Sequence, residues 1–384
     1  MWRRVSLKNY RSIESAEVEL APFTVVVGPN GSGKSNFVDA LALASEIAYD
    51  AEEAIKRRGG IKAVRRWGIA ETEESRVTVE VAEKQSELSS RCVRQSFGLL
   101  PSAESGWKFG TDLVEAVDAG KATRWANNRT VFDALRSGKP SDVLAPTTSV
   151  ALLARQIWPQ RFHIFSSRRL QLDLDAMRAP QQPGLITALK DDGSNLASVL
   201  RKLREQDASA FEFVLLAMGR LIPGLEDILV EEAGGFLLLQ FKQRQAAGVA
   251  TFAAASMSEG ALRALGIIVA ACMVSPPDLL IVEEPEVAIH PGAAALLFDV
   301  LKRASKTASV LVTTHSPELL DAAQDEEILV CSYRRGATRI GPLASEQRKV
   351  VREGLYSLSE LARSEPLRIE GEEPELLDPR DFTP

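Results

Sequence analysis

The chain has 384 residues, of which 45% are hydrophobic and 26% are charged, and its net charge is −6. This size and composition are typical of a globular protein with one large domain and an insertion, or with two domains. They exclude a polycation, so any nucleic-acid contact has to come from a local basic patch. There is no apolar run of transmembrane length and no secretory signal, and the three cysteines are far apart. We therefore expect a cytoplasmic protein without membrane contact, disulfides or a zinc site.

The first 55 residues predict three strands, a glycine-rich loop and a helix. Strands are expected over 5–9, 16–20 and 23–27. The last of these is a continuous, largely β-branched run, typical of a strand covered on both faces. The loop over 28–35 follows directly, and apolar residues at helical spacing predict a helix over 36–55.

The middle of the chain gives fewer signals. A strand is predicted over 76–82, and we assign residues 85–160 to an insertion that is largely helical. Residues 185–221 have a helical pattern. Two strand-like runs, 228–232 and 236–242, flank Ala-Gly-Gly and predict a β-hairpin.

From residue 258 onward, helices and strands alternate. Helices are expected over 260–274, 291–304 and 317–323, and strands over 279–282, 309–313 and 327–332. This alternation predicts an α/β fold with a mostly parallel sheet and helices on both faces. The acidic, proline-containing residues 366–384 predict a flexible tail.

The segment Gly28-Pro29-Asn30-Gly31-Ser32-Gly33-Lys34-Ser35-Asn36 contains the pattern Gly-x4-Gly-Lys-Ser between a buried strand and a helix. This is the context that a phosphate-binding P-loop requires. Glycines let backbone N–H groups surround phosphates, and the N-terminus of the helix points its positive end at them. We expect Lys34 to reach the β- and γ-phosphates of ATP and Ser35 to bind Mg²⁺.

Two further strands end in polar residues. The run Leu-Leu-Ile-Val-Glu-Glu-Pro-Glu over 279–286 has the Walker B pattern, in which Glu283 holds Mg²⁺ through water and Glu284 is the general base for the attacking water. The strand over 309–313 leads to His315, at the edge of the sheet where doubly wound folds bind ligands, and this predicts a γ-phosphate sensor. The alternatives are a solvated acidic turn and a structural histidine.

The segment Ser256-Met257-Ser258-Glu259-Gly260-Ala261-Leu262-Arg263 opens an apolar helix just before the Glu-Glu strand. The four sites in this order resemble the ATP-binding-cassette (ABC) ATPases, specifically the soluble SMC/RecF branch. Within that branch the chain is similar to compact bacterial RecF/OLD-like "AAA family ATPases". The resemblance extends to Leu7-Lys8-Asn9-Tyr10-Arg11-Ser12-Ile13 and implies a nucleotide contact by Arg11.

The resemblance implies an ABC-type P-loop NTPase fold with a mostly parallel core and an antiparallel β-subdomain. Residues 1–84 would form the N-terminal part of the ATPase head, 161–365 its C-terminal part, and 85–160 the inserted subdomain. The resemblance further implies a head-to-tail homodimer around two ATP molecules. Ser258 and Gly260 of one copy would contact the γ-phosphate at the partner's P-loop. His315 would be the switch histidine, and residues 288–290 the D-loop.

Several features depart from the family pattern. The signature is Ser-Glu-Gly rather than Ser-Gly-Gly, and Glu283 replaces the more usual aspartate. Only Gln85 and Gln95 are candidates for the Q-loop glutamine. The chain after residue 330 is too short for the nuclease domain of OLD proteins, so any nuclease or toxin effector is expected to be encoded separately.

The leading hypothesis is an ATP-driven conformational switch in DNA repair or in defence against phage or plasmids. A basic cluster beside Trp67 favours contact with DNA or RNA, although a solvated helix end explains it equally well. This cluster consists of Lys56, Arg57, Arg58, Lys62, Arg65 and Arg66. The alternatives are an ABC transporter-type ATPase subunit and an ATP-dependent regulator of a protein partner without nucleic acid.

Overall fold

The computed structural model describes residues 1–84, 90–118, 121–126, 166–184, 188–273 and 279–372. The fold is α/β, with one large mixed sheet, a small antiparallel sheet and helices. The strands of the large sheet, in chain order, are β1 (Trp2–Tyr10), β2 (Ile13–Glu19), β3 (Phe23–Val27), β4 (Ser75–Lys84), β5 (Ser90–Ser102), β6 (Gly106–Asp118), β7 (Lys121–Ala126), β8 (Ser167–Leu170), β12 (Leu279–Glu283), β13 (Ser309–Thr313), β14 (Ile328–Arg334) and β15 (Ala337–Pro342).

The small sheet consists of β9 (Leu225–Ala233), β10 (Phe236–Gln245) and β11 (Gly248–Ala253). The α-helices are α1 (Lys34–Ile47), α2 (Ala51–Arg57), α3 (Ile61–Val64), α6 (Leu174–Arg178), α7 (Leu196–Gln206), α8 (Ala208–Leu221), α9 (Glu259–Cys272), α10 (Pro291–Ala304), α11 (Pro317–Ala322), α12 (Ser345–Arg352) and α13 (Leu358–Ser364). Two short 3₁₀ turns, η2 (Ala254–Ser256) and η3 (Asp325–Glu327), precede α9 and β14.

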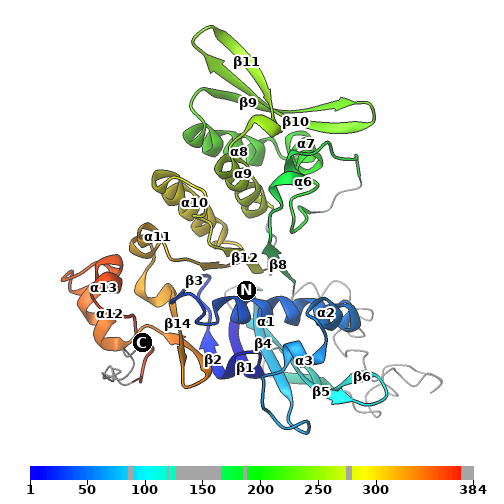
Figure 1. The fold of residues 1–384 in the computed structure, drawn as a ribbon, viewed down its shortest axis with the longest axis vertical. Helices are drawn as coiled ribbons and strands as arrows, with labels where there is room; N and C mark the ends of the chain where they lie inside the picture. Colours follow the sequence, from blue (N-terminus) through cyan, green and yellow to red (C-terminus); the bar gives the residue numbers. More distant parts are fainter. Residues whose placement is uncertain (85–89, 119–120, 127–165, 185–187, 274–278, 373–384) are drawn as a thin grey trace, which may run out of the picture.

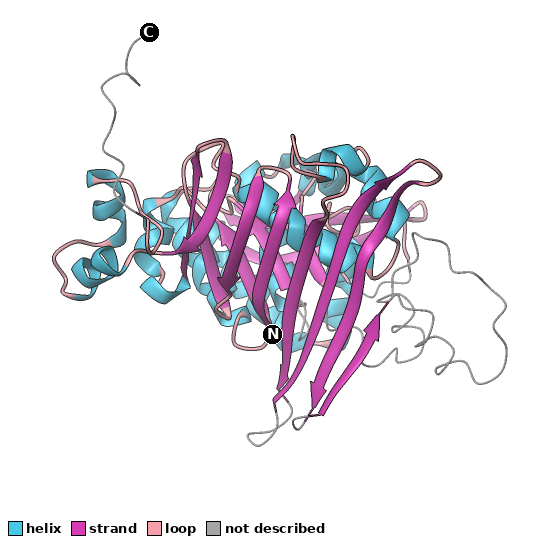
Figure 2. Ribbon diagram, turned by 90° about the horizontal axis from the view of Figure 1, so that it is seen from below, coloured by secondary structure: helices cyan, strands magenta, loops and turns pink. Residues whose placement is uncertain are grey.

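The large sheet has twelve strands in the order β7-β6-β5-β4-β1-β2-β15-β14-β3-β13-β12-β8. Neighbours from β14 to β8 pair in parallel, whereas neighbours from β7 to β2 pair antiparallel. Figure 2 shows these strands side by side as one continuous sheet. The expected parallel core and antiparallel β-subdomain are therefore two halves of a single sheet.

Both faces of the parallel half are buried, which explains the uninterrupted apolar runs in its strands. Phe23, Val25 and Val27 of β3 enter the core on the side of α9, α10 and α11. Val26 enters the other core, on the side of α1. The side chains of β12 and β13 alternate in the same way, so these strands position their carboxyl ends between two packed layers.

The small sheet covers the outer side of the helical layer. Ile228, Leu237, Leu239 and Phe241 of this sheet are buried in the same core as α7, α8 and α9. Figure 1 shows β9, β10 and β11 at the end of the molecule farthest from the large sheet. The predicted hairpin is thus present, and β11 extends it to three strands. Among the described residues, no helix is long and apolar enough to cross a membrane.

The expected helical insertion is wrong for its described part. Residues 90–102, 106–118 and 121–126 are strands β5, β6 and β7, which extend the antiparallel half of the sheet. The inward face of β5 carries the fully buried Gln95 between apolar neighbours, and the pairing shifts register between Phe97 and Leu99. These features interrupt the alternation that identifies a strand. Residues 127–160 lie outside the described residues.

The expected tail begins too early. Residues 366–372 pack against the end of the large sheet: Ile369 is 7% exposed and bridges Leu343, and the Glu370 N–H donates to the Pro342 carbonyl at 2.9 Å. One apolar side chain therefore anchors a segment whose composition is otherwise polar. Residues 373–384 lie outside the described residues.

The helix expected over 36–55 is two helices. α1 ends at Ile47, and α2 begins at Ala51 after Asp50, whose carboxylate accepts a hydrogen bond from the Glu53 N–H at 3.0 Å. An aspartate at this position satisfies the first free amides of a new helix, so the chain turns here instead of continuing.

Candidate functional site

The P-loop joins β3 to α1 and is held by the neighbouring strands β14 and β15. A Cβ atom at Gly28 would lie 2.0 Å from the Cys331 carbonyl oxygen, and one at Gly33 would lie 2.1 Å from Thr338 Oγ1. Both glycines also have positive φ angles, of 155° and 104°. Only glycine fits these two positions, because any side chain would push the loop away from the sheet.

Lys34 lies at the mouth of the loop, in the first turn of α1. Its Nζ donates to the carbonyl oxygens of Gly28 at 2.8 Å and Pro29 at 3.0 Å. Burial lowers the pKa of Lys34. The negative charges of Glu284 and Glu283 act in the opposite direction and raise this pKa, but burial has the larger effect. The lysine ammonium and these carboxylates therefore share one site.

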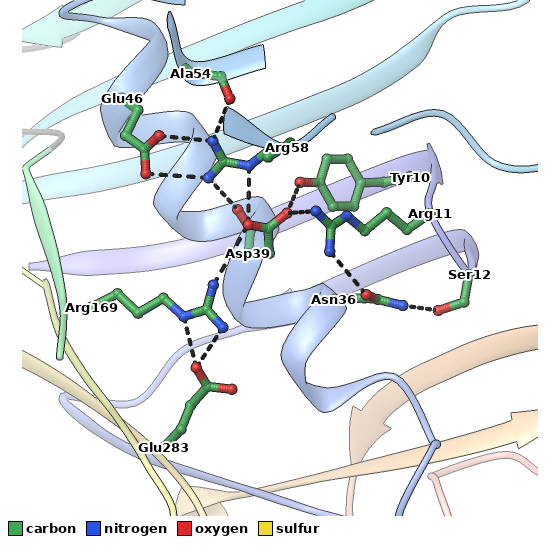
Figure 3. A network of polar contacts seen from close by, with 10 residues as sticks. All are labelled: Tyr10, Arg11, Ser12, Asn36, Asp39, Glu46, Ala54, Arg58, Arg169 and Glu283. Carbon is green, nitrogen blue, oxygen red and sulfur yellow. Dashed lines mark hydrogen bonds and ion pairs between the residues drawn. The ribbon is translucent and has the colours of Figure 1, made fainter. Parts of the chain in front are cut away.

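A chain of polar contacts joins the P-loop to the turn between β1 and β2. The Thr338 hydroxyl donates to the Ser32 carbonyl at 2.9 Å and lies 2.7 Å from the Ser12 hydroxyl. Asn36 donates to Ser12 at 2.6 Å, and Arg11 donates to the Asn36 amide oxygen at 3.5 Å. The structure thus brings Arg11 and Asn36 together at the start of α1 (Figure 3). Asn30 and Gly31 are exposed in the loop, and Ser35 is exposed in the first turn of α1.

The two acids after β12 have different surroundings. Glu283 is 22% exposed, and its Oε1 accepts from Nε and Nη2 of Arg169, each at 2.7 Å. Glu284 has a positive φ of 46°, unusual for a residue other than glycine, and its N–H donates to the Thr313 carbonyl at 2.8 Å. Its carboxylate is 45% exposed and lies 3.8 Å from His315 Nε2. The sharp turn at Glu284 therefore directs consecutive carboxylates to different places.

Glu286 fixes the loop that carries His315. Its Oε1 accepts hydrogen bonds from the Thr314 hydroxyl at 2.7 Å and from the N–H groups of His315 at 2.9 Å and Ser316 at 3.2 Å. Because one carboxylate joins the loops after β12 and β13, Glu284 and His315 hold a defined separation. Glu286 appears in the Glu-Glu-Pro-Glu run, but its role depends on contacts that the run does not reveal.

Ser258 and Gly260 begin α9 as expected. The Ser258 hydroxyl caps the helix by accepting from the Ala261 N–H at 3.2 Å. A Cβ atom at Gly260 would lie 2.3 Å from the carbonyl oxygen of Ala288, a residue with φ of 63° in the loop after Glu284. Within the described part of the chain, no hydrogen bond or ion pair joins Ser258 or Gly260 to the P-loop.

β8 is a strand beside the candidate site that the sequence did not predict. Its run Ser-Arg-Arg-Leu does not look like a strand, because an edge strand of four residues can expose charged side chains. β8 pairs in parallel with β12, so Gln171, which follows β8, lies at the same edge of the sheet as the residues that follow β12. Gln95 lies instead in β5, in the antiparallel half, and Gln85 lies outside the described residues.

The basic cluster beside Trp67 is largely occupied by internal contacts. Arg58 is 7% exposed and pairs with Asp39 at 3.0 Å and Glu46 at 2.8 Å. Arg57 pairs with Glu53, and Arg65 donates to the carbonyls of Ala70 and Glu73. Trp67 itself is 95% exposed. Arg58 is therefore buried away from the surface, whereas the side chain of Arg57 stays 66% exposed.

The residues of the P-loop fit Mg·ATP. The side of Gly31 is open, since a Cβ atom there would meet nothing within 4 Å, and α1 begins directly behind it. The Ser32 hydroxyl is buried without a hydrogen-bond partner among the described residues. A strand, a glycine loop, a lysine and a helix N-terminus provide the donors that a polyphosphate needs.

These features together define a P-loop ATPase of the SMC/RecF/OLD-like kind. The chain belongs to the family described as "AAA domain, putative AbiEii toxin, Type IV TA system", whose model matches residues 23–321. The matched residues include most strands of the parallel half of the sheet and the helical layer.

Known proteins resemble parts of the chain. It is 42% identical over 43 residues to an OLD nuclease of Thermus scotoductus, covering 11% of this chain and 8% of that protein. It is 40% identical over 57 residues to the DNA replication and repair protein RecF of Corynebacterium jeikeium, covering 14% of this chain and 13% of that protein. The chain thus matches only a small part of these relatives' length.

A solved SMC head bound to the C-winged helix domain of ScpA has the same fold, with a TM-score of 0.56 and 15% identity. The alignment covers 90% of this chain and 99% of that one.

Proposed function

We propose that this protein binds and hydrolyses ATP, and that ATP closes a dimer of two copies. The observation that carries this proposal is the arrangement along three adjacent parallel strands. β3 leads to Lys34, β12 to Glu284 and β13 to His315, so the lysine, the acid and the histidine meet at one edge of the sheet. This is the edge at which open α/β sheets bind ligands.

In this reaction the P-loop amides and Lys34 hold the β- and γ-phosphates. Ser35 and Glu283 would hold Mg²⁺, which neutralises charge developing on the phosphate oxygens. Glu284 accepts a proton from the attacking water, and its exposed carboxylate beside His315 leaves room for that water. His315 senses the γ-phosphate. Glu286 holds the loop that carries His315, and so keeps this loop at a fixed distance from Glu284.

The position of Ser258 and Gly260 supports the proposed dimer. Ser258 and Gly260 begin a helix that rests on Ala288, and no described hydrogen bond connects them with the P-loop of the same copy. We propose that they complete the γ-phosphate site of a second copy arranged head to tail. Arg11 and Asn36, beside the start of α1, contact the same nucleotide from its own copy.

The biological setting we propose is DNA repair or defence against phage or plasmids, with a separately encoded nuclease or toxin as effector. The family description, which names a putative toxin of a type IV toxin–antitoxin system, and the similarity to RecF and OLD proteins support it. A regulator that acts on a protein partner without nucleic acid is the second candidate. The internal pairing of the basic cluster and the winged-helix partner of the SMC head favour it.

Size-exclusion chromatography with light scattering tests the dimer. Glu284→Gln should bind ATP without hydrolysing it, and should elute as a dimer with Mg·ATP and as a monomer with ADP. The matched control is the double variant Glu284→Gln, Lys34→Ala, which should stay monomeric with either nucleotide. A monomer in Mg·ATP, under conditions in which bound ATP is detected, would overturn the sandwich. ATP turnover measured with and without DNA then separates the two candidate settings.

A further inference from the structure

Asp39 in α1 is the buried centre of a group of charged side chains. Its Oδ1 lies 3.0 Å from Arg58 Nε and 3.6 Å from Arg169 Nη1, and its Oδ2 lies 3.0 Å from Arg11 Nη2 and accepts from the Tyr10 hydroxyl at 2.5 Å. Figure 3 shows these four side chains converging on Asp39 from the end of β1 (Tyr10 and Arg11), the end of α2 (Arg58) and β8 (Arg169). We call Asp39 and these four residues the Asp39 hub.

Stability alone does not account for such a hub. Moving several charges out of water is costly, and well-packed apolar side chains stabilise a core at least as well. A hub of this kind restricts geometry, because charge-assisted contacts with one shared carboxylate are directional. Two members of the hub, Arg11 and Arg169, reach toward the candidate ATP site.

The register of the sheet places Arg169 beside Glu283. In the parallel pairing of β8 with β12, Arg169 is opposite Ile281, two residues before Glu283. Side chains two residues apart lie on the same face of a strand. Ile281 faces α1, so Arg169 and Glu283 also face α1, where Asp39 lies.

Arg169 occupies only one oxygen of Glu283. Both its Nε and its Nη2 donate to Oε1, whereas no hydrogen bond to Oε2 is found among the described residues. Figure 3 shows Oε2 on the side of the carboxylate away from Arg169. The guanidinium therefore fixes the rotation of the carboxylate and leaves one oxygen for another ligand.

We propose that Arg169 is a positioning residue that presents Oε2 of Glu283 to the Mg²⁺ of bound Mg·ATP. Asp39 anchors it together with Arg11, so one buried carboxylate sets both the metal contact and a phosphate contact. This inference rests on the proposed ATP-binding function. The proposal adds Arg169, which lies outside the P-loop and the Glu-Glu strand, to the candidate site. It also explains why position 283 is a glutamate rather than the shorter aspartate: the extra methylene lets the carboxylate reach Arg169 and the metal at once.

The test measures the binding of a metal ion rather than turnover. Mn²⁺ replaces Mg²⁺, a non-hydrolysable ATP analogue holds the site, and electron paramagnetic resonance reports free Mn²⁺. Removing the partner that orients a metal ligand lowers metal affinity about 10–100-fold. Arg169→Gln should therefore weaken Mn²⁺ binding about tenfold. Binding of a fluorescent ATP in EDTA should change less than about twofold, because no metal contact is involved.

Three further variants sharpen the result. Arg169→Lys keeps the charge but cannot donate twice to Oε1, so its Mn²⁺ affinity should fall between wild type and Arg169→Gln. Arg168→Gln, which lies on the other face of the same strand, is the matched control and should bind Mn²⁺ like wild type. Adding Arg169→Gln to Glu283→Gln should cause no further loss, because Arg169 acts through Glu283.

Unchanged or tighter Mn²⁺ binding by a folded Arg169→Gln variant would overturn the positioning role. Additive losses in the double variant would also overturn it, because Arg169 would then act independently of Glu283. Failure of the wild-type protein to bind the fluorescent ATP is a different result, which would refute the proposed function itself. Circular dichroism of every variant establishes that it is folded.

Discussion

The buried charge of Asp39 is balanced by single side chains that contact it directly. The side chains of Asp39 and Arg58 are each 7% exposed. Burial, with the negative charge of Asp39, raises the pKa of Tyr10 well above its usual value, so the phenol stays protonated and donates to Asp39. The protonation state of Tyr10 thus depends on its burial and on the charge of Asp39.

Asp39→Asn should lower the free energy of unfolding by about 3–5 kcal/mol, because it leaves buried guanidinium groups without their shared anion. Urea unfolding followed by circular dichroism measures this change. Glu53→Gln is the matched control: Glu53 is 42% exposed and pairs with Arg57 at i,i+4, so its loss should cost less than about 0.5 kcal/mol. A cost for Asp39→Asn no larger than that of the control would contradict the structural role of the hub.

Elements contact one another through backbone as well as side chains, and α9 is the clearest case. Gly260 is in its first turn, where the absence of a side chain lets the helix approach the Ala288 carbonyl. The backbone of α9 and the backbone of the loop after β12 are therefore closely packed at this point.

Gly260→Ala should destabilise the protein by about 1–3 kcal/mol, since the added methyl would lie 2.3 Å from the Ala288 oxygen and one of the two elements has to move. Thermal unfolding measures the change. Gly292→Ala, in the first turn of α10, is the control: its methyl would lie 3.6 Å from His290 Nδ1, an ordinary contact, so stability should stay the same or rise. Equal melting temperatures for both variants would count against the close packing of α9.

The sequence predicts elements well where their burial is uniform. β3 and β13 have the predicted bounds, and β12 is one residue longer than predicted, because strands buried on both faces are continuous apolar runs. β5 could not be identified, since Gln95 is buried on its inward face, and β8 could not, since its arginines find partners in distant elements. Prediction of the candidate site has the same limit. The P-loop is a local pattern, whereas Arg169 and Asp39 depend on the tertiary fold.

The three cysteines lie in three different parts of the whole molecule. Cys92 is in β5 of the antiparallel half, Cys331 is in β14 of the parallel half, and Cys272 ends α9 in the helical layer. Burial raises the pKa of Cys331 to about 11 and that of Cys272 to about 11. Burial and a hydrogen bond with Glu80 raise the pKa of Cys92 to about 12. Each thiol therefore reports on the folding of its own part.

At pH 8 the native protein should react slowly with thiol reagents at all three positions. A pKa raised from 9.0 to about 11 means that about a hundredfold less thiolate is present at this pH. All three thiols should react quickly once urea unfolds the chain. Mass spectrometry after a short pulse of N-ethylmaleimide measures each site, and rapid labelling of Cys331 in the native protein would contradict its burial.

The two halves of the large sheet meet at one narrow joint. β15 and β2 pair through a single position, Thr338 with Ile13, whereas every other pair of neighbouring strands shares at least three positions. The same Thr338 donates to the Ser32 carbonyl of the P-loop. In mechanical terms, a rotation of the antiparallel half against the parallel half would concentrate its strain at this joint. Such a rotation would displace the P-loop first, so a load applied at the outer edge of the sheet would be transmitted to the grip on ATP.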